Sequence, residues 1–273
     1  MIETFQLHNV IEFLQDRLLL GFGQELLIIV GTLVLRFSYE KLRKDIFLRR
    51  LCRAFGTGID NEEGIKISVP VWQAIEGDRA VPRFSKVDKG HLEKYYGPSS
   101  LFSIEDARGA NKISAIFEKI LKKTIYFTGD DQEIIPRDAT VIMIGSPLAN
   151  FHARADFSES ILTRLGGGHS FFYIEENNVS QARAGIRNIE TGKEFFSDIE
   201  TDYGVVQRKK SFLDDRSYVF LCGGIGAAAT RGACEYLSAE WPKFAKEDRL
   251  ISVLICVNKN VPSRPQEIEF VVK

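Results

Sequence analysis

Two stretches of the chain repeat one order of elements, and this repetition constrains the fold more than any other feature. The apolar stretch "ATVIMIGS" ends in Gly145 and Ser146, and "YVFLCGG" ends in Gly223 and Gly224. Continuous apolar runs are typical of strands that a sheet buries on both faces, and a helix to about Glu240 follows the second run. Alternating strands and helices of this kind predict an α/β fold with a Rossmann-like, mostly parallel sheet.

Other segments add a helix and a hairpin to this sheet. Ser103, followed three residues later by Asp106, has the pattern of a helix N-cap, and apolar residues then recur at helical spacing. Thr191 and Gly192 lie between two β-rich stretches and predict a hairpin turn. The expected parallel sheet therefore carries an antiparallel hairpin.

Length and composition define the organisation of the chain and weigh against some partners. The chain has 273 residues, 44% of them hydrophobic, which suffices for a full core. Turn-forming residues at 55–64 separate an N-terminal helical segment, 1–55, from a Rossmann-like domain, 56–273. A net charge of -1 argues against a nucleic-acid partner. The four cysteines stand singly, without metal-ligand spacing, so we expect reduced core residues and predict no metal site.

The N-terminal segment contains the apolar stretch "RLLLGFGQELLIIVGTLVLRF", residues 17–37. Its length approaches the roughly 20 residues of a membrane-spanning helix, and a basic segment follows it as on a cytoplasmic flank. Residues 18–37 therefore predict a membrane anchor in the inner membrane, with the C-terminal domain in the cytoplasm. Gln24 and Glu25 interrupt the stretch, which leaves open a buried helix or a dimer interface in a cytoplasmic protein.

The glycine turn after "YVFLCGG" has the composition of a loop that binds phosphate. Glycines let the backbone approach an anion, and the first turn of the next helix offers free N–H groups at its positive end. The expected ligand contacts are Gly223, Gly224, Gly226, Thr230 and Arg231. The same small residues also suit close packing of a helix on a sheet, and the sequence leaves both interpretations open.

The turn after "ATVIMIGS" supplies a second set of ligand contacts, because ligands of open parallel sheets bind at the carboxyl ends of the strands. We expect Asn150 to hydrogen-bond a base or ribose and Arg154 to hold a phosphate. The full set in this turn is Gly145, Ser146, Asn150 and Arg154.

Three residues are candidate acids or bases. His152 lies in the first glycine turn, Asp202 begins a strand, and Glu235 lies on the helix after the second turn. Each also has a structural interpretation: Asp202 as a turn residue and Glu235 as an ion-pair partner of Arg231 four residues earlier. The sequence has no catalytic signature such as a nucleophile elbow or HExxH.

The order of these pieces resembles a group of bacterial proteins that join a membrane helix to a cytoplasmic Rossmann-like domain. The resemblance is carried by "QELLIIVGTLVL", "IMIGSPLAN", "DYGVV" and "FLCGGIGAAATRGACEYL". That group has a GGP-x-x-N turn after a strand and a later DYG followed by G-x-G-T-x-x-A. Here Ser146 replaces the second glycine of the first turn, and Ala229-Thr230 departs from a simple G-T pair. The resemblance implies a tethered domain and no established activity.

The leading functional hypothesis is a membrane-tethered domain that binds a nucleotide or nucleotide-derived ligand and has a sensing or effector role. One alternative is a hydrolase or N-glycosidase that processes a nucleotide with Asp202, Glu235 or His152. Another is a non-catalytic interaction protein that forms a homo-oligomer through its apolar helix. The sequence identifies no cofactor.

Overall fold

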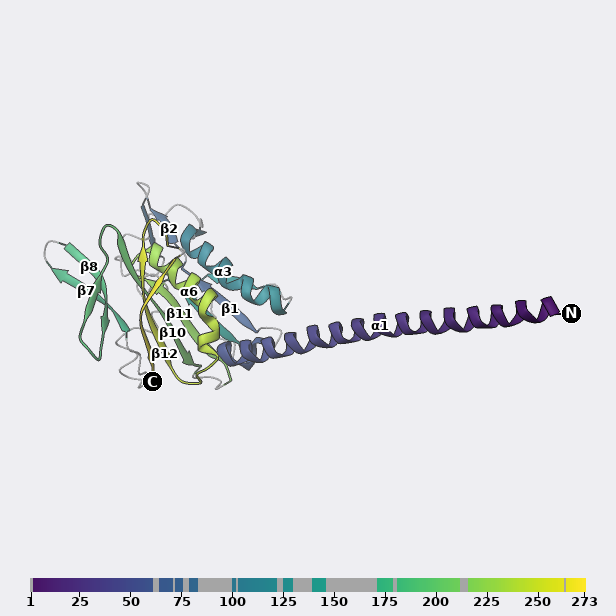
Figure 1. Ribbon diagram of the computed structural model, residues 1–273. Coiled ribbons are helices and arrows are strands. Elements are labelled where there is room, and N and C mark those ends of the chain that lie inside the picture. The colour runs from purple at the N-terminus through teal and green to yellow at the C-terminus, as the bar shows by residue number, and fades with distance from the viewer. Residues whose placement is uncertain are drawn as a thin grey trace. The chain divides into compact units, whose positions relative to one another are not determined.

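The computed structural model describes residues 2–60, 64–70, 72–75, 79–82, 100–101, 103–121, 125–129, 139–145, 171–178, 181–211, 216–262 and 264–273; for 2–27 it describes the backbone alone. Contacts between Cα atoms group the chain into two compact units, Met1–Arg49 and Arg50–Lys273. Figure 1 labels α1 (Ile2–Phe55) and several helices and strands of the second unit, which is an α/β fold. The predicted site residues Ser146, Asn150, His152 and Arg154 lie outside the described residues.

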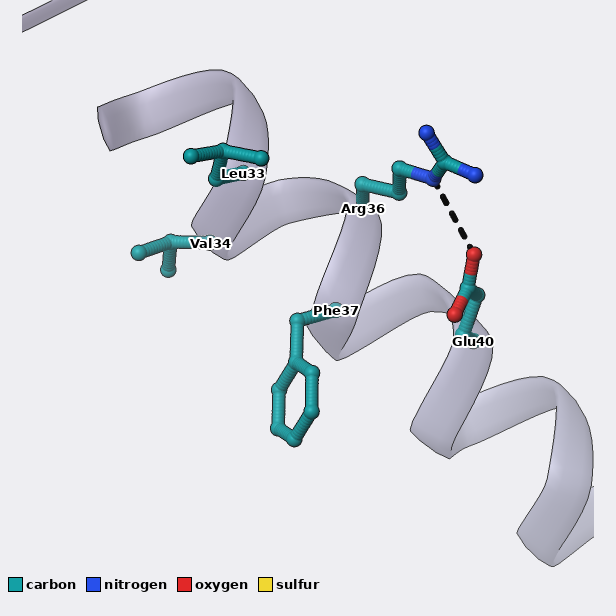
Figure 2. Close-up of a pocket in the computed structure, with 5 residues that line it drawn as sticks. All are labelled: Leu33, Val34, Arg36, Phe37 and Glu40. Atoms are coloured by element: carbon teal, nitrogen blue, oxygen red, sulfur yellow. Dashed lines mark hydrogen bonds and ion pairs between the residues drawn. The ribbon is translucent and has the colours of Figure 1, made fainter. Parts of the chain in front are cut away.

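Helix α1 (Ile2–Phe55) is continuous over 54 residues and supplies the first unit. From Ile28 to Ile46 its apolar side chains are exposed; Leu35 and Phe37, for example, are each 71% exposed. Leu33, Val34 and Phe37 project from the helix beside the Arg36–Glu40 ion pair, whose N···O distance is 3.1 Å (Figure 2). No helix segment among the residues with described side chains is long and apolar enough to cross a membrane.

The second unit is built on one large mixed sheet. Its strands are β1 (Ile65–Val69), β5 (Tyr126–Gly129), β6 (Thr140–Ile144), β10 (Thr201–Lys210), β11 (Tyr218–Gly224), β12 (Ile251–Asn258) and β13 (Gln266–Val272), in the spatial order β13-β12-β10-β11-β6-β1-β5. The pairs β5–β1, β1–β6 and β6–β11 are parallel. The pairs β11–β10, β10–β12 and β12–β13 are antiparallel. The sheet is therefore mixed, and the expectation of a mostly parallel sheet is wrong.

The strand β12 explains this error. Its sequence "ISVLICVN" is as continuously apolar as the two parallel strands, and its core residues Val253, Leu254 and Ile255 are fully buried. A continuous apolar run records burial on both faces of a strand and does not record the direction of its neighbours. Strand β12 is buried on both faces and runs antiparallel to β10.

Helices cover one face of the sheet (Figure 1), and a small second sheet packs against part of the other face. Helix α6 (Ala227–Phe244) packs on β10, β11 and β12, and helix α3 (Ile104–Leu121) packs on α6, β1 and β6. On the opposite face, β7 (Phe171–Asn178), β8 (Gln181–Asn188) and β9 (Glu194–Phe196) form an antiparallel sheet. Phe171, Ile186 and Phe195 of this sheet share one apolar core with the large sheet.

The remaining described elements are the short helix η1 (Thr57–Asp60) and a sheet of β2 (Trp72–Ile75), β3 (Arg79–Pro82) and β4 (Ser100–Leu101). Two predicted local signals are confirmed. The Ser103 hydroxyl accepts the Asp106 N–H at 3.4 Å, and Ser103 directly precedes α3. Gly192 has a positive φ of 67° in the turn between β8 and β9, where a left-handed conformation favours glycine.

The last turn of α1 belongs to the core of the second unit. Leu51, Ala54 and Phe55 are fully buried. The Phe55 ring lies 4.8 Å from that of Phe117 and 4.9 Å from that of Phe220, measured between centroids. This turn of helix thus packs against both α3 and the central strand β11.

Arg208 on β10 is a fully buried cation that binds carbonyl groups at the ends of two helices and in the segment after α6. Its guanidinium donates four hydrogen bonds to carbonyl oxygens, at 3.2 Å to Ala54, 2.6 Å to Phe244, 2.5 Å to Glu247 and 2.8 Å to Arg249. The guanidinium carbon also lies 4.4 Å from the centroid of the Tyr218 ring. Burial lowers the pKa of Arg208 to about 10, so the side chain stays charged at neutral pH. The acceptors include the carbonyl ends of α1 and α6, where the helix dipole is negative.

We expect Arg208→Met to lower the free energy of unfolding by about 3 kcal/mol or more, because each buried carbonyl left without a donor costs roughly 1–3 kcal/mol. Lys210→Met is the matched control, since Lys210 is exposed on the same strand. Urea denaturation of both variants measures the difference. Equal stability of the two variants would contradict the assigned role of Arg208.

Candidate functional site

The two glycine turns predicted to bind a ligand meet at one edge of the sheet. Strands β6 and β11 are parallel neighbours, with Ile144 opposite Cys222. The N–H of Gly145 donates to the carbonyl oxygen of Cys222 at 3.0 Å, and Gly145 has a positive φ of 102°. The backbone thus turns sharply at the carboxyl end of β6, directly beside Gly223.

The strand order favours this edge of the sheet as the place where a ligand would bind. The chain passes from β1 to β5 on one side, then returns to β6 on the other side of β1 and continues to β11. In open α/β sheets, ligands bind outside the carboxyl ends of the strands at such a reversal of direction. The N-termini of α3 and α6 lie at the same edge, because α6 begins directly after the carboxyl end of β11, and Ala107 in the first turn of α3 lies beside Val69 at the carboxyl end of β1.

Close packing of a helix on the sheet, one of the two interpretations left open by the sequence, explains part of the glycine pattern. A Cβ at Gly224 would lie 2.3 Å from the Thr230 nitrogen, and one at Gly204 would lie 2.9 Å from the Ala229 oxygen. Across the helix pair, a Cβ at Gly109 of α3 would lie 2.7 Å from the Cys234 sulfur of α6. These glycines let α6 approach β10, β11 and α3 more closely than residues with a side chain would allow.

The N-terminus of α6 already contacts a carboxylate, that of Asp202. This side chain is fully buried at the start of β10. One carboxylate oxygen accepts the Gly226 N–H at 3.2 Å, and the other accepts the Ala229 N–H at 3.1 Å. A Cβ at Gly226 would lie 2.6 Å from Asp202, so glycine is required there for the carboxylate to fit. Asp202 thus occupies two amides that a bound phosphate would otherwise use.

The pKa of Asp202 reflects two opposing effects. Burial raises it, while the N–H groups of Ala229, Tyr203 and Gly226 and the charge of Lys259 lower it; the net direction is upward. The carboxylate is therefore held by backbone dipoles in a site that is poorly solvated.

The amides of Ala227, which is exposed, and Ala228, which is half-buried, have no hydrogen-bond partner within the described part of the chain. The Gly224 N–H donates to the Thr230 hydroxyl at 3.1 Å, and the Ile225 N–H donates to the Tyr203 carbonyl at 2.9 Å. Of this loop, the two alanine amides are what remains for an external anion.

The predicted site residues on α6 divide into two groups. Thr230 is buried, and its hydroxyl closes the turn by accepting from Gly224. Arg231 lies between α3 and α6, with N···O distances of 3.1 Å to Glu105 and 3.8 Å to Glu235. Glu235 also pairs with Lys112 at 3.8 Å. The expected pairing of Arg231 with Glu235 is present, and no described contact joins Glu235 to Asp202.

Asp106 is a buried acid at this edge that the sequence interpretation used only as part of a helix cap. It lies in the first turn of α3 and is 4% exposed. Burial, together with the charge of Glu105, raises its pKa to about 7. A carboxyl group with a pKa near neutrality is suited to donate or accept a proton at physiological pH. This burial could not be predicted from the sequence, because burial of the first helical turn arises only from packing.

A cavity of about 230 Å³ lies beside Asp106's helix, at the ends of β1 and β5. Val69 and Phe127 line it from the strands, and Ala107, Ala110 and Asn111 line it from α3. Phe127 is 45% exposed, and the lining is almost entirely apolar. This volume is smaller than the roughly 300–1,000 Å³ of sites for whole drug-sized ligands, so it suits a single ring or a short apolar group.

No family model, curated protein or solved structure matches this chain. The resemblance to bacterial proteins with a membrane helix and a Rossmann-like domain stays a prediction.

The pKa of Asp106 predicts a pH-dependent stability. Its value is about 7 in the folded protein and 3.8 in its ordinary state, so between these values the folded protein holds a proton that the unfolded chain releases. The free energy of unfolding should therefore fall as the pH rises from about 4 to about 7. Asp106→Asn should flatten this slope and be more stable than the wild type at pH 8. Urea denaturation at pH 5 and pH 8 tests this, with exposed Asp248→Asn as the control. An unchanged slope in Asp106→Asn would contradict the pKa assignment.

Asp202→Ala should destabilise the fold by about 1–2 kcal/mol, the usual cost of losing a helix-capping side chain. Asp198→Ala is the comparison, because Asp198 also accepts two backbone N–H bonds, at 2.9 Å and 2.6 Å, but in an exposed turn. Thermal unfolding should show the larger loss for Asp202→Ala. If Asp198→Ala costs as much, burial of the Asp202 cap makes no contribution.

Proposed function

We propose that the α/β domain is Rossmann-like and binds a nucleotide or nucleotide-derived ligand at the carboxyl ends of β6 and β11. We further propose that residues 18–37 tether this domain to the inner membrane with the domain in the cytoplasm, in a sensing or effector role. The observation that carries the proposal is the Gly145 to Cys222 hydrogen bond, which brings both glycine turns to the ligand edge of the sheet.

The free amides give the phosphate group a position. Ala227 and Ala228 offer two N–H groups at the positive end of α6, an 18-residue helix. The carboxylate of Asp202 restricts the anion to these outer amides, since the inner ones at Gly226 and Ala229 are occupied. Arg231 contributes little net charge, because two glutamates neutralise it.

The apolar cavity gives the ring of the ligand a position. Strands β5 and β6 lie on either side of β1, so their ends are about 10 Å apart at the usual strand spacing. A nucleotide with its phosphate near Gly145 and α6 would reach Phe127 with its base. Aromatic side chains stack on bases with roughly 1–3 kcal/mol per base, and the Asn111 amide could bond a base edge.

The exposed apolar side chains of α1 support the membrane tether. Ile28, Ile29 and Val30 are 68%, 56% and 49% exposed, and such side chains favour transfer out of water. Lys41, Arg43 and Lys44 follow the apolar stretch, as expected for a helix that leaves a membrane on its cytoplasmic side.

Ala227→Asp tests the ligand site directly. A carboxylate in the first turn of α6 favours the helix dipole, so the variant should fold at least as stably as the wild type, while it repels an anion from the free amides. Full-length protein is screened by thermal shift with nucleoside mono-, di- and triphosphates and dinucleotides. A ligand at 100 times its Kd stabilises the wild type by about 2.7 kcal/mol, and this shift should vanish in Ala227→Asp.

Ala239→Asp is the matched control, because Ala239 is exposed three turns further along the same helix. It should keep the full ligand-induced shift. A panel without any stabilising nucleotide, or equal shifts in both variants, would reject binding at this turn.

A hydrolase or N-glycosidase is the second candidate, favoured by the near-neutral pKa of the buried acid Asp106. An enzyme of this kind would convert the bound ligand to products. Chromatography of the reaction mixture measures those products. Asp106→Asn should then abolish product formation while ligand binding persists, whereas Glu235→Gln, in the ion pairs between α3 and α6, should retain it. Ligand binding without products from the wild type would leave the binding function alone.

A further inference from the structure

We propose that α1 joins two copies of this chain as a parallel coiled coil. The contact surface is a stripe of residues, here called the α1 stripe, spaced alternately by four and three positions. It consists of Ile28, Thr32, Leu35, Tyr39, Leu42 and Ile46. This 4-3 spacing keeps one seam of a helix facing a second helix along its length.

The α1 stripe is exposed in the single chain. Tyr39 is 64% exposed and Leu42 58% exposed, although large apolar side chains normally avoid water. Beyond Phe37 the other positions carry Glu40, Lys41 and Lys44, so lipid cannot surround this part of the helix. A second helix covers only a narrow stripe and leaves the charged positions in water. A bilayer would instead surround the charged positions as well.

The same spacing continues upstream in the sequence. Leu7, Ile11, Leu14 and Leu18 fall on the extension of the α1 stripe, and the backbone is one uninterrupted helix from Ile2. The 4-3 spacing thus runs from Leu7 to Ile46, longer than the three to four heptads that indicate a coiled coil, with Gly21 and Glu25 as the non-apolar positions between Leu18 and Ile28. A polar residue on the seam, such as Glu25, specifies the register of a pair of helices at a cost in stability.

Charge complementarity selects a parallel pair of identical chains. In this register, Asp45 of one copy lies opposite Arg50 of the other, the relation of the flanking positions in parallel coiled coils. The intrahelical pair Arg36–Glu40 needs no partner from another copy. The α1 stripe ends at Ile46, just before the α/β unit begins at Arg50. Each helix of the pair would therefore continue directly into its own α/β unit.

Disulfide crosslinking of full-length protein in detergent tests the seam. In a Cys52→Ser background, which removes the partly exposed native cysteine of α1, Leu42→Cys should form a covalent dimer under mild oxidation. Lys44→Cys, two residues away but off the α1 stripe, should lack this dimer. Equal crosslinking of both variants, or none in Leu42→Cys, would overturn the proposal.

Mass measurement by sedimentation gives a second readout that needs no cysteine. The wild type should have twice the 30.9 kDa of one chain after correction for detergent. Leu35→Asp with Leu42→Asp should halve the protein mass, while Lys41→Asp with Lys44→Asp should leave it unchanged. A monomeric wild type, or a trimer or larger assembly, would refute a pair. Nucleotide binding does not enter either readout, so the two proposals fail independently.

Discussion

The arrangement of the α/β unit depends on one buried cation, Arg208, and on the carbonyl groups that surround it. The side chain is fully buried, and its hydrogen bonds reach the end of α1, the end of α6 and the segment after α6. A guanidinium suits this place because its donors are fixed in a plane and its charge complements the negative ends of two helices. No described carboxylate forms an ion pair with it; the carbonyl dipoles, the Tyr218 ring and the nearby charges of Glu247 and Asp248 compensate the charge. Such a group ties helix ends together because leaving any of these carbonyls unpaired in the interior is costly.

Strand β10 contacts both ends of α6 with opposite charges. Asp202, at the start of the strand, accepts N–H groups of the first turn, and Arg208, six residues later on the same face, donates to the Phe244 carbonyl at the last turn. Each charge matches the helix pole that it contacts. This arrangement fixes α6 on the sheet, and it also determines what a ligand can reach. The inner amides of the glycine turn bind Asp202 and hold α6 in place, which leaves the outer amides at Ala227 and Ala228 without a described partner.

Much of the fold was accessible from local patterns, and the errors have identifiable causes. Strands β6 and β11, helices α3 and α6 and the turn at Gly192 follow from apolar periodicity and turn chemistry, which depend on neighbours in the chain. The mixed direction of the sheet did not follow, because β12 is buried like a parallel strand. The importance of Asp106 and Arg208 was missed for a related reason: a charged letter in a strand or first helical turn predicts exposure, and both are buried.

The sequence by itself determined the classes of element, the two glycine turns and the heptad spacing of α1, since each is set by residues within a few turns or a short strand. Tertiary structure alone decided how those pieces are used. It placed Gly145 beside Cys222, set the Asp202 carboxylate against the turn that was expected to bind phosphate, and buried Asp106 so that its pKa rises to about 7. These outcomes depend on contacts between residues far apart in the chain, where solvent is excluded and backbone dipoles converge. No local pattern encodes those conditions.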